Sequence, residues 1–67
     1  MNRQKLNRII SLVLNAIKKE QGERREMLRQ CIRNLNSARY FLKQQNEKYA
    51  RFHAELAFNY LKQARAM

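Results

Sequence analysis

The strongest constraint on this chain is how little it contains that would end a helix. Its 67 residues include no proline and a single glycine, Gly22. Aspartate is also absent, and most of the chain is Leu, Ala, Arg, Lys, Gln, Glu and Asn. Most of these residues favour helices, whereas turns are usually marked by Gly, Pro, Asp or Ser. The sequence therefore predicts an all-α fold, a small helical bundle in which residues 1–67 form one domain.

A chain of this length has difficulty building a stable core by itself. A domain of about 60 residues buries only about 60% of the surface that its unfolded form exposes. Cys31 is the only cysteine, so an intramolecular disulfide is excluded, and no Cys/His cluster has the spacing of a metal site. We therefore expect no metal and no cofactor, but close helix packing and self-association, with a homodimer as the simplest form. A lone thiol fits a reducing compartment, so we expect a cytoplasmic protein.

Apolar residues at helical spacing predict a first helix over about residues 3–20. Asn2 is a suitable N-cap, and Gly22 is placed to adopt the left-handed conformation that ends many helices. The apolar arc is wide, which indicates that more than one neighbour covers this helix. The residues on this arc are Leu6, Ile9, Ile10, Val13, Ala16 and Ile17, flanked by Leu12 and Leu14.

Two further apolar stripes lie on either side of a polar segment at residues 44–47. On a helical wheel they stay in phase to within about 20–30°. The earlier stripe consists of Leu28, Cys31, Ile32, Leu35, Ala38 and Leu42, and the later one of Tyr49, Phe52, His53, Leu56, Ala57, Tyr60 and Ala64.

The polar segment allows two architectures. In one, the chain turns near Gln45 or Asn46 and forms helices over about residues 23–43 and 47–65, with Asn46 as the second cap. In the other, a single helix runs over about residues 23–65, and its uncovered half is buried in a dimer. Gln45 and Asn46 would then form a polar layer that sets the register. No Gly, Pro, Ser or Asp marks a turn, so we slightly favour the long helix in an oligomer.

Charge is the second large feature of the sequence. Fifteen Lys and Arg oppose five Glu, which gives a formal net charge of +10. Such an excess favours a polyanionic partner: nucleic acid, an acidic protein surface or an anionic membrane.

A row of cations is predicted on the outer face of the second helix. Its members fall within about 80° of one another on the wheel, and only Glu26 lies at the margin. Arginine forks in such a row suit phosphates, and a tyrosine among them suits base stacking. A plain solvated face is the competing interpretation, although such faces normally mix both signs of charge. The predicted nucleic-acid-binding residues are Arg25, Arg29, Arg33, Asn36, Tyr40 and Lys43.

A second basic patch is predicted towards the C-terminus. It combines three cations with a phenylalanine that lies off the apolar stripe, a combination that suits base stacking, a membrane or a protein contact. Phe41 also lies off its stripe. Packing against another protomer is the simpler explanation of both phenylalanines, and it supports self-association. The second patch consists of Arg51, Phe58, Lys62 and Arg65.

No residue set in the sequence predicts catalysis. His53 lies on the inner edge of its stripe without a nucleophile or acid beside it, and Cys31 is placed as a small core residue. We therefore predict a binding protein and not an enzyme, with no catalytic residues.

Three binding functions remain, in order of preference. The first is a regulatory or accessory protein that binds structured RNA or DNA through phosphates. The second is a protein–protein adaptor, inhibitor or small subunit that docks its Arg-rich face on an acidic partner. A membrane-surface role comes last, because a stable bundle would hide the apolar arc that it needs.

Overall fold

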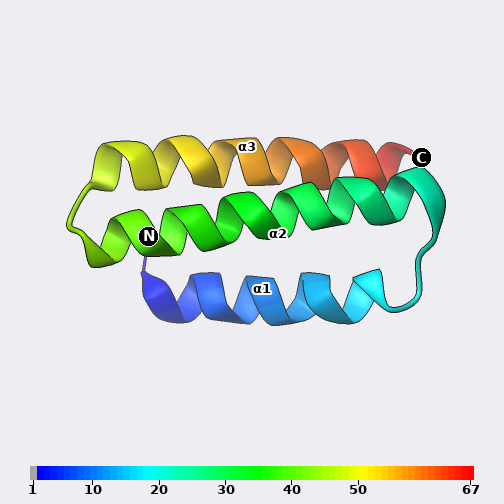
Figure 1. The fold of residues 1–67 in the computed structure, drawn as a ribbon, viewed down its shortest axis with the longest axis horizontal. Helices are drawn as coiled ribbons and strands as arrows, with labels where there is room; N and C mark the ends of the chain where they lie inside the picture. The colour runs from blue at the N-terminus through cyan, green and yellow to red at the C-terminus, as the bar shows by residue number, and fades with distance from the viewer. Residues whose placement is uncertain (1) are drawn as a thin grey trace.

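The structure, a computed structural model, describes residues 2–67 and has three helices there, arranged up-down-up (Figure 1). α1 spans Arg3–Ile17, α2 spans Gly22–Lys43 and α3 spans Glu47–Ala66. The long helix over residues 23–65, which we favoured, is therefore wrong, and the two-helix alternative is right. α1 also ends three residues before the predicted boundary at residue 20.

The turn between α2 and α3 is a helix-ending motif that normally uses glycine. Gln45 takes the left-handed conformation, with a φ of 61°. Its backbone N–H donates to the Leu42 carbonyl at 3.0 Å, and the Asn46 N–H donates to the Phe41 carbonyl at 2.8 Å. These are the two hydrogen bonds of the Schellman motif. The Asn46 side chain then accepts from the Tyr49 N–H at 3.3 Å and caps α3, as the two-helix alternative predicts.

The connection between α1 and α2 is longer than predicted. Asn2 caps α1 as expected, accepting from the Lys5 N–H at 2.8 Å. Gly22 does take a left-handed φ, 68°, but it lies at the start of α2 and not at the end of α1. The prediction that Gly22 ends α1 is therefore wrong in position, because Lys18 already forms the C-cap.

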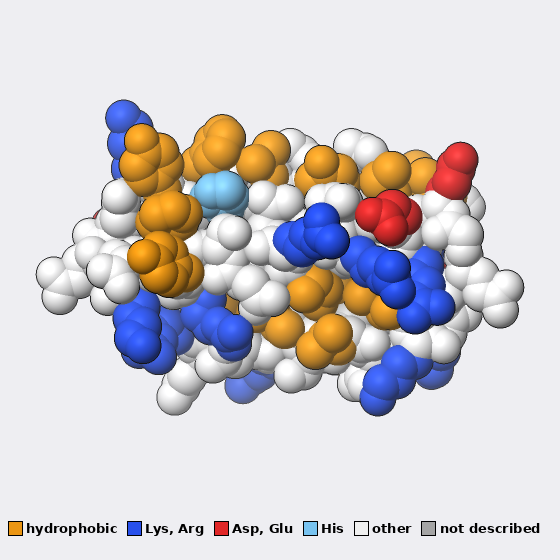
Figure 2. Space-filling model, viewed as in Figure 1, with side chains coloured by type: hydrophobic (Ala, Val, Ile, Leu, Met, Phe, Trp, Pro, Cys, Tyr) orange, Lys and Arg blue, Asp and Glu red, His pale blue; other side chains and the backbone are white. Residues whose placement is uncertain are grey.

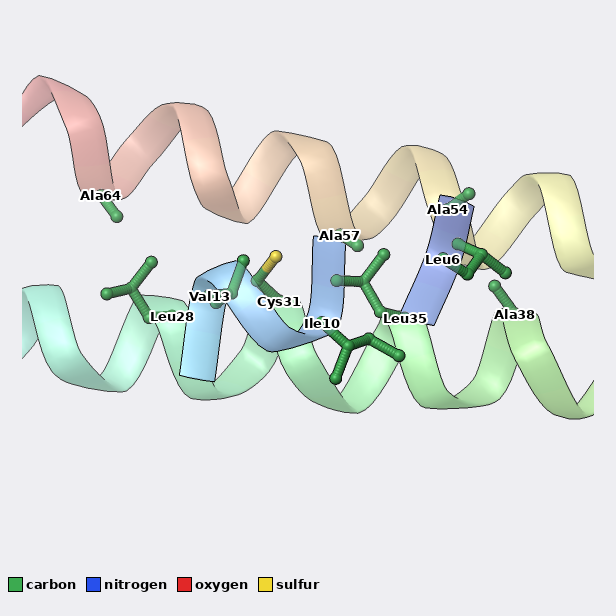
Figure 3. Close-up of a cluster of buried hydrophobic side chains, with 10 residues drawn as sticks. All are labelled: Leu6, Ile10, Val13, Leu28, Cys31, Leu35, Ala38, Ala54, Ala57 and Ala64. Carbon is green, nitrogen blue, oxygen red and sulfur yellow. The ribbon is translucent and has the colours of Figure 1, made fainter. Parts of the chain in front are cut away.

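α2 and α3 pack against each other through a seam of small residues. On α3 the seam consists of four alanines, each exposed by 2% or less, at positions 50, 54, 57 and 64. Leu28, Cys31, Leu35 and Ala38 are the buried residues of α2 (Figure 3). Both sets alternate between steps of three and four residues, the spacing of a coiled-coil seam, if the partly buried Leu61 is included. Alanine side chains allow the two helix backbones to approach closely.

The predicted core stripe of α3 is therefore only partly correct. Ala57 and Ala64 are buried, but Tyr49 and Phe52 are 52% and 53% exposed. The buried face is centred on the alanines instead and is rotated by roughly 80° from the predicted stripe at 100° per residue.

α1 completes the core from one side only. Leu6, Ile10 and Val13 are buried in the same cluster as the seam residues (Figure 3). Backbone contact is made with α2 alone, since no Cα of α1 lies within 8 Å of one in α3. Leu12 and Leu14 stay 64% and 46% exposed. α1 and α3 thus run parallel to each other on either side of α2 (Figure 1).

Arg24, near the start of α2, contacts both the end of α3 and the segment that connects α1 to α2. Its Nε donates to the Ala64 carbonyl at 3.1 Å, and Nη2 donates to the Met67 carbonyl. Nη1 lies 3.5 Å from Glu20 Oε2. An arginine at these carbonyls satisfies acceptors that the end of α3 leaves free and opposes the negative end of its dipole.

Within residues 2–67, no helix is both long and apolar enough to cross a bilayer.

Replacing Gln45 by glycine should stabilise the protein. A left-handed conformation costs a non-glycine residue about 1–2 kcal/mol, and glycine would remove this cost. Glycine also makes the unfolded chain more flexible, which offsets about 0.4–1 kcal/mol of that gain. We expect a net gain of roughly 0–1.6 kcal/mol in the free energy of unfolding, measured by urea denaturation. In an uninterrupted helix the same change would cost about 1 kcal/mol, so the sign decides between the architectures. Gln63→Gly, within α3, is the matched control and should destabilise in either case.

Ala54→Leu tests the alanine seam at a position outside the predicted stripe. Ala54 is 2% exposed, so added methylenes must push α2 and α3 apart. We expect a loss of about 1–3 kcal/mol in thermal or urea unfolding. Ala66→Leu, at an exposed position of the same helix, should change stability by less than about 0.5 kcal/mol. A neutral or stabilising Ala54→Leu would show that the helices do not meet there.

Candidate nucleic-acid interface

The residues of the predicted row share one exposed face of α2. All six of its residues are exposed: Arg25, Arg29, Arg33, Asn36, Tyr40 and Lys43. They lie across the helix from the buried seam, at about 140° from its centre on the wheel. Figure 2 shows Lys and Arg side chains spread across the face of the molecule over α2. We call this face the arginine row.

The arginines of the row have no carboxylate partner. Within residues 2–67, the single ion pair closer than 4 Å joins Arg24 to Glu20. Glu26, the acid at the margin of the row, accepts instead from the Gln30 side chain at 3.2 Å. The guanidinium groups of Arg25, Arg29 and Arg33 therefore have no carboxylate within 4 Å in the described part of the chain. Their charge is available to an external anion.

Asn36 makes a side-chain hydrogen bond within α2 besides lying on the arginine row. Its Oδ1 accepts from Arg39 Nη2 at 3.1 Å, while Nη1 of the same arginine donates to Asn7 Oδ1 on α1 at 2.8 Å. Arg39 therefore bridges α1 and α2 beside the row. The wheel places it at the edge between the seam and the row, which is why sequence reasoning passed over it. Asn36 supports this bridge as well as lying on the row.

Aromatic side chains gather where α2 turns into α3. Phe41 packs edge-on to Tyr40 at 5.3 Å between ring centroids and at 5.4 Å from Tyr49. It also stacks on His53 at 5.4 Å, with only 10° between the ring planes. Phe52 packs edge-on to His53 at 5.3 Å. Figure 2 shows this group as hydrophobic side chains around the pale-blue histidine, with Lys and Arg nearby. We call these five residues the aromatic end.

Three rings of the aromatic end are open to solvent. Tyr40, Tyr49 and Phe52 are 58%, 52% and 53% exposed. Phe41 is covered within its own chain, so it no longer argues for packing against a second protomer. Sequence reasoning missed this group because Tyr49 and Phe52 were assigned to the core. The available signal was that aromatics flank the polar turn on both sides.

His53 is a structural residue of this group. Its Nδ1 donates to Asn34 Oδ1 at 3.0 Å, and the Asn34 amide donates in turn to the Gln30 carbonyl at 2.9 Å. The half-buried ring is thereby fixed between α2 and α3. His53 thus lies at the edge of the α2–α3 contact, in agreement with its predicted place on the inner edge of the stripe.

The residues of the second predicted patch, Arg51, Phe58, Lys62 and Arg65, are all exposed on α3. Phe58 and Arg65 line a groove that also involves α1 and α2. Arg51 lines a separate hollow on α3 together with Glu47, Lys48, Phe52 and Glu55. Lys62 is exposed on α3 but lines neither of these two. The four residues thus share one helix, and two of the hollows on its surface are each lined by part of the patch.

Cys31 lies in the seam and is fully buried. Burial raises the pKa of its thiol from an ordinary value of 9.0 to about 11. A thiol of this kind is protonated at neutral pH and is a poor nucleophile. Among residues 2–67, no three His, Cys, Asp or Glu side chains are grouped so that they could hold a metal ion.

Comparison with protein-family models, with curated proteins and with solved structures finds no match to this chain.

The buried Cys31 thiol should make stability depend on pH in the alkaline range. Its folded pKa, about 11, lies above the ordinary value of 9.0, so the folded state holds the proton more tightly. The stability that the protonated Cys31 thiol contributes is fully present below about pH 9 and is lost as the pH rises towards 11. We expect the difference in unfolding free energy between wild type and Cys31→Ala to narrow over this window in urea titrations. A constant difference would show that the thiol is not buried.

Proposed function

We propose that this protein binds nucleic acid through its phosphates, along the arginine row of α2. The observation that carries the proposal is the set of three exposed arginines, Arg25, Arg29 and Arg33, with no carboxylate within ion-pair distance. A solvated helix face normally mixes both signs of charge. A helix face that carries positive charge alone, in a chain of net charge +10, is suited to binding a polyanion.

The spacing of the arginines suits an extended strand of phosphates. Steps of four residues place successive guanidinium groups about 6 Å apart along the helix axis. Each guanidinium offers a planar fork of N–H donors that can bind a phosphate through two hydrogen bonds. Lys43 continues the row at the C-terminal end of α2. Phosphate contacts of this kind supply affinity without sequence preference.

The aromatic end gives the row a site for bases. Tyr40 belongs to both, and Tyr49 and Phe52 present exposed rings beside it. Stacking on such rings requires bases that are free of a double helix. Single strands and the loops of structured RNA offer such bases next to their phosphates, so we place these ahead of duplex DNA.

The arrangement of the helices also favours nucleic-acid contact along the side of α2. Neighbouring helices run antiparallel (Figure 1), whereas the recognition helix of a helix-turn-helix motif crosses its predecessor at about 90–120°. Binding along a helix face, without insertion of a helix end into a groove, fits a regulatory or accessory role better than operator recognition.

The arginine row should determine how binding depends on salt. Each phosphate contact contributes about 0.7 to the slope of log affinity against log salt for single strands, and about 0.9 for duplex DNA. Arg29→Ala combined with Arg33→Ala should therefore lower the slope by about 1.4–1.8. Fluorescence anisotropy with a labelled RNA hairpin, a single strand and duplex DNA, titrated over salt, measures this.

Arg3→Ala combined with Arg8→Ala is the matched control, because it removes the same charge from α1. It should leave the slope nearly unchanged if the contact is local. Equal losses for both double variants, with weak binding to all three probes that vanishes at physiological salt, would contradict the proposal. The arginine row would then be a candidate surface for an acidic protein, and a pull-down would be the next experiment.

A further inference from the structure

An open apolar groove lies on the other side of α2 from the arginine row. It has a volume of about 640 Å³ and runs between α1 and α3. Ile9 and Leu12 form one wall, Phe58 and Leu61 form the other, and Leu28 of α2 lies between them. The groove exists because α1 and α3 both lie against α2 without approaching each other.

Each wall of this groove holds a large apolar side chain that is exposed to solvent. Leu12 is 64% exposed and Phe58 is 39% exposed. They lie on two helices that run in the same direction on either side of α2 (Figure 1). A fourth helix placed in the groove would contact both walls and complete a four-helix arrangement. Helix-in-groove recognition uses this kind of site, with apolar anchors on one face of the bound helix.

The edges of the groove carry positive charge. On α1, Lys5 and Arg8 lie on the wheel beside the wall formed by Ile9 and Leu12, and Lys19 follows on the same side. On α3, Arg65 lines the groove and Lys62 lies next to Phe58 on the wheel. All five cations are exposed. Glu20, the acid that lines the groove, is already paired with Arg24.

This charge pattern selects among the possible occupants. A second copy of the chain would bring another net charge of +10 against cationic edges. A flat bilayer would meet the edges before it reached Leu28 at the base. An amphipathic helix with an apolar stripe and acidic flanks matches both the walls and the edges. We propose that the groove is the docking site for an acidic amphipathic helix of a protein partner.

The probe is a synthetic 18-residue peptide with leucines at helical i, i+3, i+4 and i+7 spacing and glutamates on both flanks. A peptide of the same composition in scrambled order removes the stripe but keeps the charge. We expect the striped peptide to bind one per chain and at least tenfold more tightly than the scrambled one, by calorimetry or anisotropy. NMR shift changes should fall on the groove-lining residues of α1 and α3.

Leu12→Gln should weaken binding of the striped peptide at least tenfold. The matched control is Leu14→Gln, which alters another exposed leucine of α1 that does not line the groove, and it should change binding less than twofold. Lys62→Glu combined with Arg65→Glu should also weaken binding at least tenfold. Because these side chains are exposed, circular dichroism should show that each variant keeps its helices.

Three outcomes would overturn the proposal. Equal binding of the striped and scrambled peptides would show attraction of charge alone. A dimer in sedimentation that Leu12→Gln dissociates would make a second copy the occupant. Binding to vesicles of anionic phospholipid that depends on Leu12, without peptide binding, would make it a lipid surface. The groove proposal does not rest on nucleic-acid binding, since Leu12→Gln leaves the arginine row intact and either proposal can fail alone.

Discussion

The close packing of α2 against α3 through alanines determines the rest of this structure. Small side chains in the seam let the two backbones approach, since Ala54, Ala57 and Ala64 of α3 are buried in one cluster with Leu35 and its neighbours on α2. The aromatic side chains of α3 lie outside this seam. On one flank, Tyr49 and Phe52 form the aromatic end, and on the other, Phe58 forms a wall of the groove. Both candidate binding surfaces are therefore consequences of the same seam.

The seam also explains why charge and apolar surface lie on different sides of α2. One side of this helix is used by α1 and α3, which leaves the opposite side fully exposed along its length. Placing cations there separates them from the core and from one another by whole helical turns. Self-repulsion still works against compaction in a chain of this net charge. Arg24 partly opposes it, because it uses its charge to satisfy carbonyls at the end of α3.

Helical periodicity predicted the features that depend on the wheel alone. The all-α class, the Asn2 cap, the core of α2 and the exposure of all six residues of the arginine row follow from spacing and residue type, and the structure agrees. The core of α3 was misplaced because large aromatic residues were given more weight than the alanines, although the alanines have the more regular spacing. The turn near Gln45 or Asn46 was only the less favoured alternative, because Gln45 occupies a conformation that usually needs glycine. The Arg39 bridge and the groove depend on how helices pair, which a single-helix wheel cannot show.

The exposed apolar residues of this small domain have a physical meaning beyond incomplete burial. A chain of 67 residues has little core to spare, yet Leu12, Phe58, Tyr49 and Phe52 all remain open to water. Apolar patches rimmed by polar residues are typical of interaction surfaces, and the cost in stability is tolerated where binding needs them. Their grouping at the turn and along one groove, each beside exposed cations, is the shared basis of the two proposals, nucleic-acid binding and the docking of an acidic helix.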